Sequence, residues 1–300
     1  MTASNAIHPL TILPAQGEPP VGSAVVASYY DQKTASILKK YGPGPRVHFH
    51  IGHFEGHPNT GVEAEVLRQR IRQAQEEVIE RAARAWDAPH TFAGRLLDVG
   101  CGLGGGALYW AQHCLTDVTA VTIAKEHLPL IAHFAQAAGV GERVHPVLSD
   151  ACEVRAEEPF DAVVAMESSC YFPRERWFQH LRRLVRPGGA VCIEDTFLGL
   201  PECREPFDRY WRTRIGAVSE YVRAAREAGF VLEGNVDLTE GTSEFWAQSI
   251  AWSRRILRSE EVDEAEARRL RISIRWHKYF HAAWLRRGIE VRLLKFIRQG

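Results

Sequence analysis

The sequence predicts an α/β fold in which seven strands form a mostly parallel sheet with helices on both faces. From residue 95 onward, short apolar runs alternate with runs of helical periodicity, which is the pattern of repeated strand–helix units. The runs "DAVVAM" and "AVCIED" are almost continuously apolar, as strands buried on both faces are. A glycine-rich loop, "GCGLGGG", joins the first of these strands to a helix.

The residues before the sheet are predicted to be largely helical. Residues 1–22 contain Pro and Gly without periodicity and are expected to form a loose arm. A helix with an aromatic face is predicted over 24–40, and the segment "YGPGPR" ends it. The looped segment "VHFHIGHF" then leads into a long amphipathic helix over 61–87. Residues 23–90 thus form a helical segment ahead of the core.

The core is predicted to run from residue 91 to 300. Its first five strands are expected at 95–99, 117–122, 144–148, 160–166 and 190–195, with helices near 105–114, 126–139 and 174–185. Residues 197–228, rich in aromatic and charged side chains, interrupt the alternation as an insertion. The last two strands are "GFVLEGNVDLT" and "IEVRLLKFIRQ", separated by a long helical region.

The composition is that of a soluble globular protein. Lys+Arg and Asp+Glu balance at 37 each, so no nucleic acid partner is expected. Ten Lys/Arg and one acid, Glu290, lie between Arg268 and Arg298, which fits a solvated helix face or an anionic substrate. The six cysteines form no C-x-x-C pair, and neither a signal peptide nor a membrane span is predicted. A reduced, cytoplasmic protein is expected, and homo-oligomerisation stays open.

The glycine loop predicts a ligand site at the end of the first strand. In "LLDVGCGLGGG", Gly100, Gly102 and Gly104 permit a tight strand-to-helix turn and a close approach of the ligand to the backbone. Many nucleotide-binding sites use such a loop, so a different nucleotide is an alternative. Asp98, inside the strand end, suits a ligand that carries an ammonium group. S-adenosylmethionine has one, and NAD does not.

Residues 95 to 195 resemble a class I S-adenosylmethionine-dependent methyltransferase. "LLDVGCGLGG" resembles the first motif of that family, "SDACEV" its adenine-binding acidic loop, and "LRRLVRPGGAVCIED" the turn before its fifth strand. The resemblance implies a Rossmann-like fold with S-adenosyl-L-methionine as cofactor. It also implies that the cofactor contacts Asp98, Gly100, Gly102, Gly104, Asp150 and Ala151.

The segment after the second strand, "VTAVTIAKEH", resembles the "GVTLS-x-x-Q" branch of the family. That branch includes cyclopropane synthases, sterol and tocopherol methyltransferases and prenyl-diphosphate methyltransferases. Thr122 stands where many methyltransferases carry an acid for the ribose, and His127 stands in place of the glutamine. Both side chains can donate and accept a hydrogen bond, so both are candidate ribose contacts. The alternative for His127 is an ordinary histidine on a helix surface.

The segment "AMESSCYF" resembles the "N-E-S-x-x-Y" segment of terpenoid C-methyltransferases such as geranyl diphosphate C-methyltransferase. Met166 departs from that pattern, and Glu167 matches its glutamate, the proposed base of that family. Methyl addition to an alkene leaves a carbocation, which aromatic faces stabilise and a carboxylate can deprotonate. The candidate catalytic rings are Tyr30, Tyr171 and Trp211. Core packing of the rings and a structural role for Glu167 are the alternatives.

Residues 28–56 resemble the lid of the same enzymes, which implies that residues 23–90 close over the cofactor and that the insertion caps the substrate. A substrate diphosphate needs cationic or hydrogen-bonding partners, and Mg²⁺ could bind through it. The candidate substrate contacts are Arg46, His48, His50, His53, Phe54, Tyr210 and Trp246, with Arg212, Arg214 and Lys278 as further cations. No protein-bound metal is expected.

The resemblance therefore implies C-methylation of a small isoprenoid diphosphate, of the geranyl or farnesyl type, in terpenoid biosynthesis. Two alternatives stay open. One is O-, N- or C-methylation of a prenylated or other small natural product, and the other is a non-catalytic partner subunit. Isoprenoid C-methylation is distinguished from methylation of another small natural product by whether the cavity beside Glu167 is aromatic and ends in a basic patch.

Overall fold

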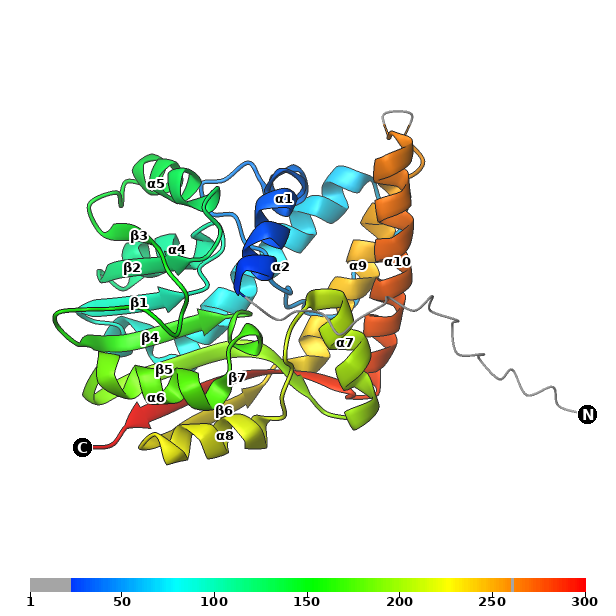
Figure 1. Ribbon diagram of the computed structural model, residues 1–300. Helices are drawn as coiled ribbons and strands as arrows, with labels where there is room; N and C mark the ends of the chain where they lie inside the picture. The colour runs from blue at the N-terminus through cyan, green and yellow to red at the C-terminus, as the bar shows by residue number, and fades with distance from the viewer. Residues whose placement is uncertain (1–22, 260–261) are drawn as a thin grey trace, which may run out of the picture.

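The computed structural model describes residues 23–259 and 262–300, and the arm predicted for residues 1–22 lies outside them. Its strands are β1 (Arg95–Val99), β2 (Asp117–Thr122), β3 (Val144–Leu148), β4 (Phe160–Met166), β5 (Val185–Leu198), β6 (Phe230–Asp237) and β7 (Ile289–Arg298). They form one seven-stranded sheet in the order β3-β2-β1-β4-β5-β7-β6 (Figure 1). The first five strands pair in parallel, and β7 lies antiparallel between β5 and β6. The predicted α/β fold with a mostly parallel sheet is confirmed.

Three helices follow the parallel strands where they were predicted: α4 (Gly105–His113), α5 (His127–Ala137) and α6 (Arg174–Leu184). A fourth, α8 (Val218–Glu227), lies within the predicted insertion. The sheet is buried on both faces, because alternate residues of each central strand belong to two separate apolar clusters. On β4, Val164 belongs to one cluster and Val163 to the other. Since parallel strands end at one edge of the sheet, the chain segments that follow them are brought together there.

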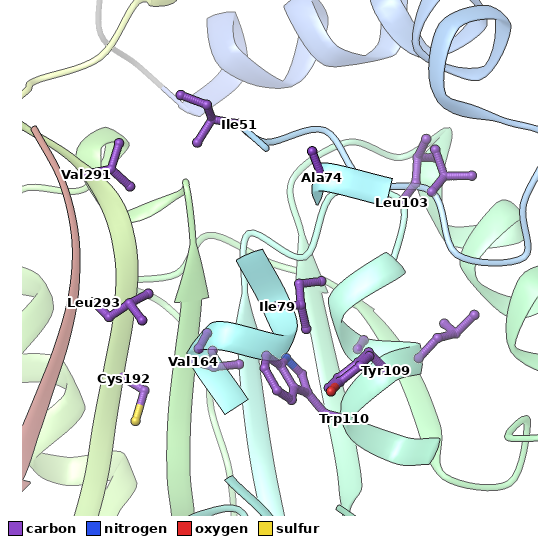
Figure 2. Close-up of a cluster of buried hydrophobic side chains, with 14 of the residues drawn as sticks. Ile51, Ala74, Ile79, Leu103, Tyr109, Trp110, Val164, Cys192, Val291 and Leu293 are labelled. Carbon is purple, nitrogen blue, oxygen red and sulfur yellow. The ribbon is translucent and has the colours of Figure 1, made fainter. Parts of the chain in front are cut away.

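The larger apolar cluster joins the sheet to α2 (Ala64–Trp86). Figure 2 shows Val164 on β4, Cys192 on β5 and Leu293 on β7 together with Ile79 of α2. Ile51, from the segment that precedes α2, lies above the strand tips in the same view. The N-terminal helical segment is therefore anchored in the core of the sheet domain.

Four further helices stand at one side of the sheet (Figure 1): α1 (Ser23–Tyr41), α7 (Arg204–Trp211), α9 (Thr239–Ile256) and α10 (Glu264–Leu285). The short helix α3 (Ala88–Thr91) connects α2 to β1, and two short 3₁₀ turns, η1 (Ser169–Tyr171) and η2 (Pro201–Cys203), follow β4 and β5. Figure 1 shows α9 and α10 side by side, and α9 also packs against α2. No helix among the described residues has the length and apolar character needed to cross a bilayer.

The largest difference from the sequence prediction concerns the fifth strand. It was expected at 190–195, and it extends to Leu198 because residues 196–198 pair with Val291, Glu290 and Ile289 of β7. The irregular connection after it ends earlier than expected too, because α8 packs against α6 and β6 as part of the layer that covers the sheet. The insertion within 197–228 is thus confined to residues 199–217.

Candidate active site

Two adjoining cavities lie at the carboxyl ends of the strands. The first is lined by the glycine loop, by residues that follow β2, β3 and β4, and by the segment around His48. The second, with a volume of about 370 Å³, is lined by α1, α7, α9 and α10 together with residues at the ends of β4 and β5. This volume lies within the range of small-molecule sites. The residues that line both cavities are Tyr30, Ile37, Phe49, His50, Glu167 and Tyr171.

The glycine loop wraps one side of the first cavity. Gly100 has φ 72°, and a Cβ atom there would lie 2.4 Å from the Cβ of Ser168, so only glycine fits. Gly102 has φ 55° and faces open space, which leaves its backbone accessible to a ligand. Gly104, with φ 83°, precedes the first turn of α4 and does not line the cavity. The loop therefore has the shape of a ligand cradle.

Asp98 is the buried acid of the first cavity. Its side chain is 2% exposed, and burial raises the pKa of its carboxyl to about 7. A ligand that brings a positive charge would stabilise the ionised carboxylate and offset the cost of burial. The buried Asp98 therefore favours a ligand with a positively charged group at this position.

Two further predicted cofactor contacts line the first cavity, Thr122 and His127. The hydroxyl of Thr122 accepts a hydrogen bond from the Ala124 N–H at 3.1 Å. His127 is buried rather than exposed on a helix surface, with its two ring nitrogens 3.0 Å from the Gly102 carbonyl and from the Thr34 hydroxyl. His127 therefore ties the glycine loop to α1.

The loop after β3 behaves differently. Ala151 lines the first cavity, whereas Asp150 does not. One carboxylate oxygen of Asp150 accepts a hydrogen bond from the Cys152 N–H at 2.8 Å. Asp150 thus shapes the loop that presents Ala151.

Glu167 lies at the boundary between the two cavities. Its φ of 42° is in the left-handed region, which is strained for a residue with a side chain. The Glu167 N–H donates to the Glu194 carbonyl at 2.8 Å, and the Ile51 N–H donates to its carboxyl Oε1 at 2.7 Å. Burial raises the pKa of Glu167 to about 8, and the nearby charge of Asp195 acts in the same direction. A carboxyl with this pKa can take up a proton near neutral pH.

The second cavity has an aromatic wall. Its rings come from the helices, from η1 and from the segment before α2: Tyr30, Tyr41, Phe49, Tyr171, Phe207, Tyr210, Trp211, Phe245, Trp246, Trp252 and Trp284. The hydroxyls of Tyr30 and Tyr171 lie 3.1 Å apart and share a hydrogen bond, which joins α1 to η1. Trp211 packs edge-on against Phe49 and stacks on Phe280. The three predicted catalytic rings therefore all line this cavity.

Comparison with known proteins assigns the family. A family model described as a methyltransferase domain matches residues 96–189. The chain is 30% identical over 190 residues to the 27-O-demethylrifamycin SV methyltransferase of Amycolatopsis mediterranei (strain S699), which covers 60% of this chain and 69% of that protein. The chain belongs to the S-adenosylmethionine-dependent methyltransferases.

Two more relatives extend the comparison. The methyltransferase is 25% identical over 243 residues to the 2-methyl-6-phytyl-1,4-hydroquinone methyltransferase of Synechocystis sp. (strain ATCC 27184 / PCC 6803 / Kazusa), over 75% of this chain and 72% of that one. It superposes on geranyl diphosphate C-methyltransferase from Streptomyces coelicolor A3(2), in complex with Mg²⁺, geranyl-S-thiolodiphosphate and S-adenosyl-L-homocysteine. That match has a TM-score of 0.76 at 17% identity and covers 95% of this chain and 100% of that chain. At this identity the match shows the fold alone. The predicted enzyme class and its cofactor, S-adenosylmethionine, are confirmed.

Four cations that the sequence patterns do not single out line the second cavity: Lys33, Lys39, Lys40 and Arg269. Lys39 binds Glu266 at 2.6 Å, whereas the other three form no ion pair with a residue that the structure describes. The sequence does contain a signal for Lys33 and Lys40, because they follow Tyr30 by three and ten residues and so lie near its face of α1.

Lys40 is the most buried of these cations. Its Nζ lies 5.0 Å from the ring centre of Tyr41 and 4.9 Å from that of Trp252, and it donates to the Ser249 hydroxyl at 3.4 Å. Burial lowers the pKa of Lys40 to about 7. An anionic ligand would stabilise its charged form, which no carboxylate of the described chain does.

Several predicted substrate contacts lie elsewhere. Arg46 binds the Glu76 carboxylate at 3.0 Å and Gln112 at 2.9 Å, and it lines neither of the two cavities. The backbone N–H of Phe54 donates to Gly241, and its ring packs in the core. The His53 ring packs against Gly241, also outside both cavities. These three residues are held by α2, α4 and α9, which the sequence alone could not show.

The other predicted contacts reach the site. His48 lines the first cavity, with Nε2 3.0 Å from the Glu76 carboxylate. His50 lines both cavities, and its Nδ1 lies 2.8 Å from the Ile51 carbonyl. Burial lowers the pKa of His50 to about 3, so its imidazole is neutral. Tyr210 and Trp246 line the second cavity, and Arg212, Arg214 and Lys278 do not.

Proposed function

We propose that the methyltransferase adds a methyl group to an alkene carbon of an isoprenoid diphosphate of the geranyl or farnesyl type. The observation that carries the proposal is the second cavity, which combines aromatic walls, three cations without an ion pair in the described part of the chain, and Glu167 at its boundary with the first. An O-methyltransferase needs a base beside a hydroxyl, and it has no use for an aromatic cavity that stabilises a cation.

The first cavity is the proposed cofactor site. Asp98 binds the ammonium group of S-adenosylmethionine, and Gly100 and Gly102 bring the backbone close to it. Thr122 contacts the ribose through its hydroxyl. The adenine lies against the loop of Asp150 and Ala151. His127 and Gly104 act indirectly, by fixing the glycine loop and the start of α4.

The proposed reaction uses the boundary between the cavities. An alkene carbon of the substrate attacks the sulfonium methyl, so the S–CH₃ bond breaks, a C–C bond forms and the neighbouring carbon becomes cationic. The faces of Tyr30, Tyr171 and Trp211 stabilise this cation through their ring quadrupoles. Glu167 then takes the proton from an adjacent carbon, and the C–H electron pair restores the double bond.

The diphosphate is proposed to lie against Lys33, Lys40 and Arg269. Such a dianionic or trianionic group would supply the negative charge that these cations lack within the described chain. Mg²⁺ would enter with the substrate, bound through the diphosphate oxygens. Because α1 lines both cavities, it serves as the proposed lid over the cofactor and the substrate, with residues 199–217 as a cap.

A second candidate function, O-methylation of a small natural product, is favoured by two observations. One relative is a methyltransferase named for 27-O-demethylrifamycin SV, and the neutral imidazole of His50 lines both cavities. A neutral imidazole can accept a hydrogen bond from a substrate hydroxyl and so orient it.

The test is incubation with S-adenosylmethionine and a substrate panel, followed by mass analysis of the products. The panel contains geranyl and farnesyl diphosphate, the corresponding free alcohols and a set of prenylated phenols, each with and without Mg²⁺. We expect methylated diphosphates and no methylation of the alcohols. Methylation of the phenols alone would contradict isoprenoid C-methylation and support the second candidate function, O-methylation.

A further inference from the structure

Three acidic residues beside the boundary between the cavities lie close enough for their charges to interact. Glu167 follows β4, and Glu194 and Asp195 are consecutive residues of β5. Met166 pairs with Glu194 in the sheet, and the Glu167 N–H donates to the Glu194 carbonyl. Glu194 and Asp195 are completely shielded from solvent, at 0% exposure. Three buried acids this close cannot all be ionised.

The hydrogen-bond donors differ among the three carboxyls. Asp195 accepts from the Ser169 hydroxyl at 2.6 Å, from the Cys170 N–H at 2.9 Å and from the Thr196 N–H at 2.7 Å. Glu167 accepts one hydrogen bond, from the Ile51 N–H. Neither carboxyl oxygen of Glu194 has a partner in the part of the chain that the structure describes. Burial raises the pKa of Asp195, as it does for the other two carboxyls, but the three donors of Asp195 act in the opposite direction. Since donors stabilise the ionised form, Asp195 ionises first, Glu167 second and Glu194 last.

The other titratable groups around Glu167 are neutral near pH 7. Burial raises the pKa of each phenol and thiol and lowers the pKa of the imidazole in this set: Tyr30, Tyr41, Tyr171, Cys170 and His50. The cations of the second cavity, Lys33, Lys40 and Arg269, form no ion pair with Glu167 or Asp195. The fixed charge that acts on Glu167 from the protein is therefore that of Asp195.

Resting on the proposed role of Glu167, we infer that Asp195 is a positioning residue that keeps Glu167 basic through a fixed negative charge. The same carboxylate holds η1, because two of its three donors belong to Ser169 and Cys170, next to Tyr171. Asp195 also lines the second cavity, where its charge favours the transient cation. Glu194 stays protonated and adds no charge.

The test is the pH dependence of kcat/KM for the isoprenoid diphosphate at saturating cofactor. In the wild type, the rate rises with pH as Glu167 ionises. Asp195→Asn removes a negative charge beside Glu167, so the midpoint of this rise is expected to move about one pH unit lower, with a plateau reduced by less than about tenfold. Ser169→Ala is the matched control, because it removes a donor and keeps the charge, and its midpoint should stay in place. A midpoint that is the same in Asp195→Asn and in the wild type overturns the inference.

A second measurement does not depend on the folding of a variant. Carboxyl ¹³C chemical shifts of the wild type, followed from pH 6 to 9, should show Glu167 titrating and Asp195 already ionised. Titration of Asp195 in this range, at or above the midpoint of Glu167, overturns the inference. Failure of the proposed function looks different: the wild type would then give no methylated product from any isoprenoid diphosphate, so no pH profile would be obtained.

Discussion

The two cavities of the methyltransferase are built in different ways. The first is formed largely by loops that follow strands, so most of its residues come in short contiguous motifs between Asp98 and Ser168, and α1 and the segment around His48 complete its lining. The second is assembled from α1, α7, α9 and α10, whose residues span positions 30 to 284. The first presents the buried Asp98 and glycine backbone, and the second presents aromatic rings and three cations without an ion pair among the described residues. The proposed cofactor site is thus largely a local motif, whereas the proposed substrate site is an arrangement that exists only after folding.

The largest effect is expected at the boundary between the cavities. Glu167→Gln should reduce turnover by about a thousandfold or more, because the cation can no longer lose its proton to the protein. Cofactor affinity, measured by calorimetry, should stay within about twofold of the wild type. Turnover within a few-fold of the wild type would show that another group is the base.

The next effect isolates the first cavity. Asp98→Ala should weaken S-adenosylmethionine binding by about a hundredfold, because a charge-assisted hydrogen bond is lost in a buried site. With the pKa of the free carboxyl at about 7, wild-type affinity should fall about tenfold from pH 8 to pH 6, as protonation removes the binding form. Asp98→Asn should show no such pH dependence. A pH dependence that survives in Asp98→Asn would place the titrating group elsewhere.

A third, smaller effect isolates the second cavity. Lys40→Gln should raise KM for the diphosphate substrate by about tenfold, since one charge-assisted contact is worth roughly 1.5 kcal/mol or more. Lys39→Gln is the matched control on the same helix, because Lys39 already binds Glu266 and should change KM by less than about twofold. Equal effects of the two substitutions would mean that general positive charge, rather than the buried lysine, attracts the substrate.

The smallest effect is one of stability. Burial and the charges of Glu167 and Asp195 raise the pKa of Glu194 well above its ordinary value. The folded state therefore holds a proton that the unfolded state releases, and wild-type stability falls as the pH rises above the pKa of the unfolded chain. Glu194→Gln cannot ionise, so its melting temperature should exceed that of the wild type by a few degrees at pH 8 and by less at pH 5. A lower melting temperature at pH 8 would contradict the assignment of a neutral, unpartnered carboxyl.

The sequence predicts the fold and the first cavity well for one physical reason. Strand–loop–helix units are local, so the acid and glycines from Asp98 to Gly104 can be read from consecutive positions. The extension of β5 could not be read in this way, because its partner β7 lies roughly ninety residues further along the chain.

The second cavity could not be predicted from the sequence either, because its contacts join distant parts of the chain. Arg46 is a plausible anion contact from the sequence, but in the fold it pairs with Glu76. The surroundings of Lys40 are not visible in the sequence, because Trp252 and Ser249 come from α9. The sequence gives a weak indication of a site at Asp195, because this acid ends an apolar run that is predicted to form the strand next to the one before Glu167. The three donors of Asp195 could not be foreseen, because two of them belong to η1. The roles of Arg46, Lys40 and Asp195 thus depend on contacts with residues distant in the sequence, rather than on residue type alone.

The most direct measurement of the central claim is the position of the transferred methyl group. The methyltransferase is incubated with geranyl diphosphate, Mg²⁺ and S-adenosylmethionine labelled with ¹³C in its methyl, and the product is analysed by ¹³C NMR. We predict a labelled methyl bound to carbon, in a product that keeps its diphosphate and its number of double bonds. A methyl bound to oxygen, or no product from any isoprenoid diphosphate while a phenol is methylated, would contradict the account.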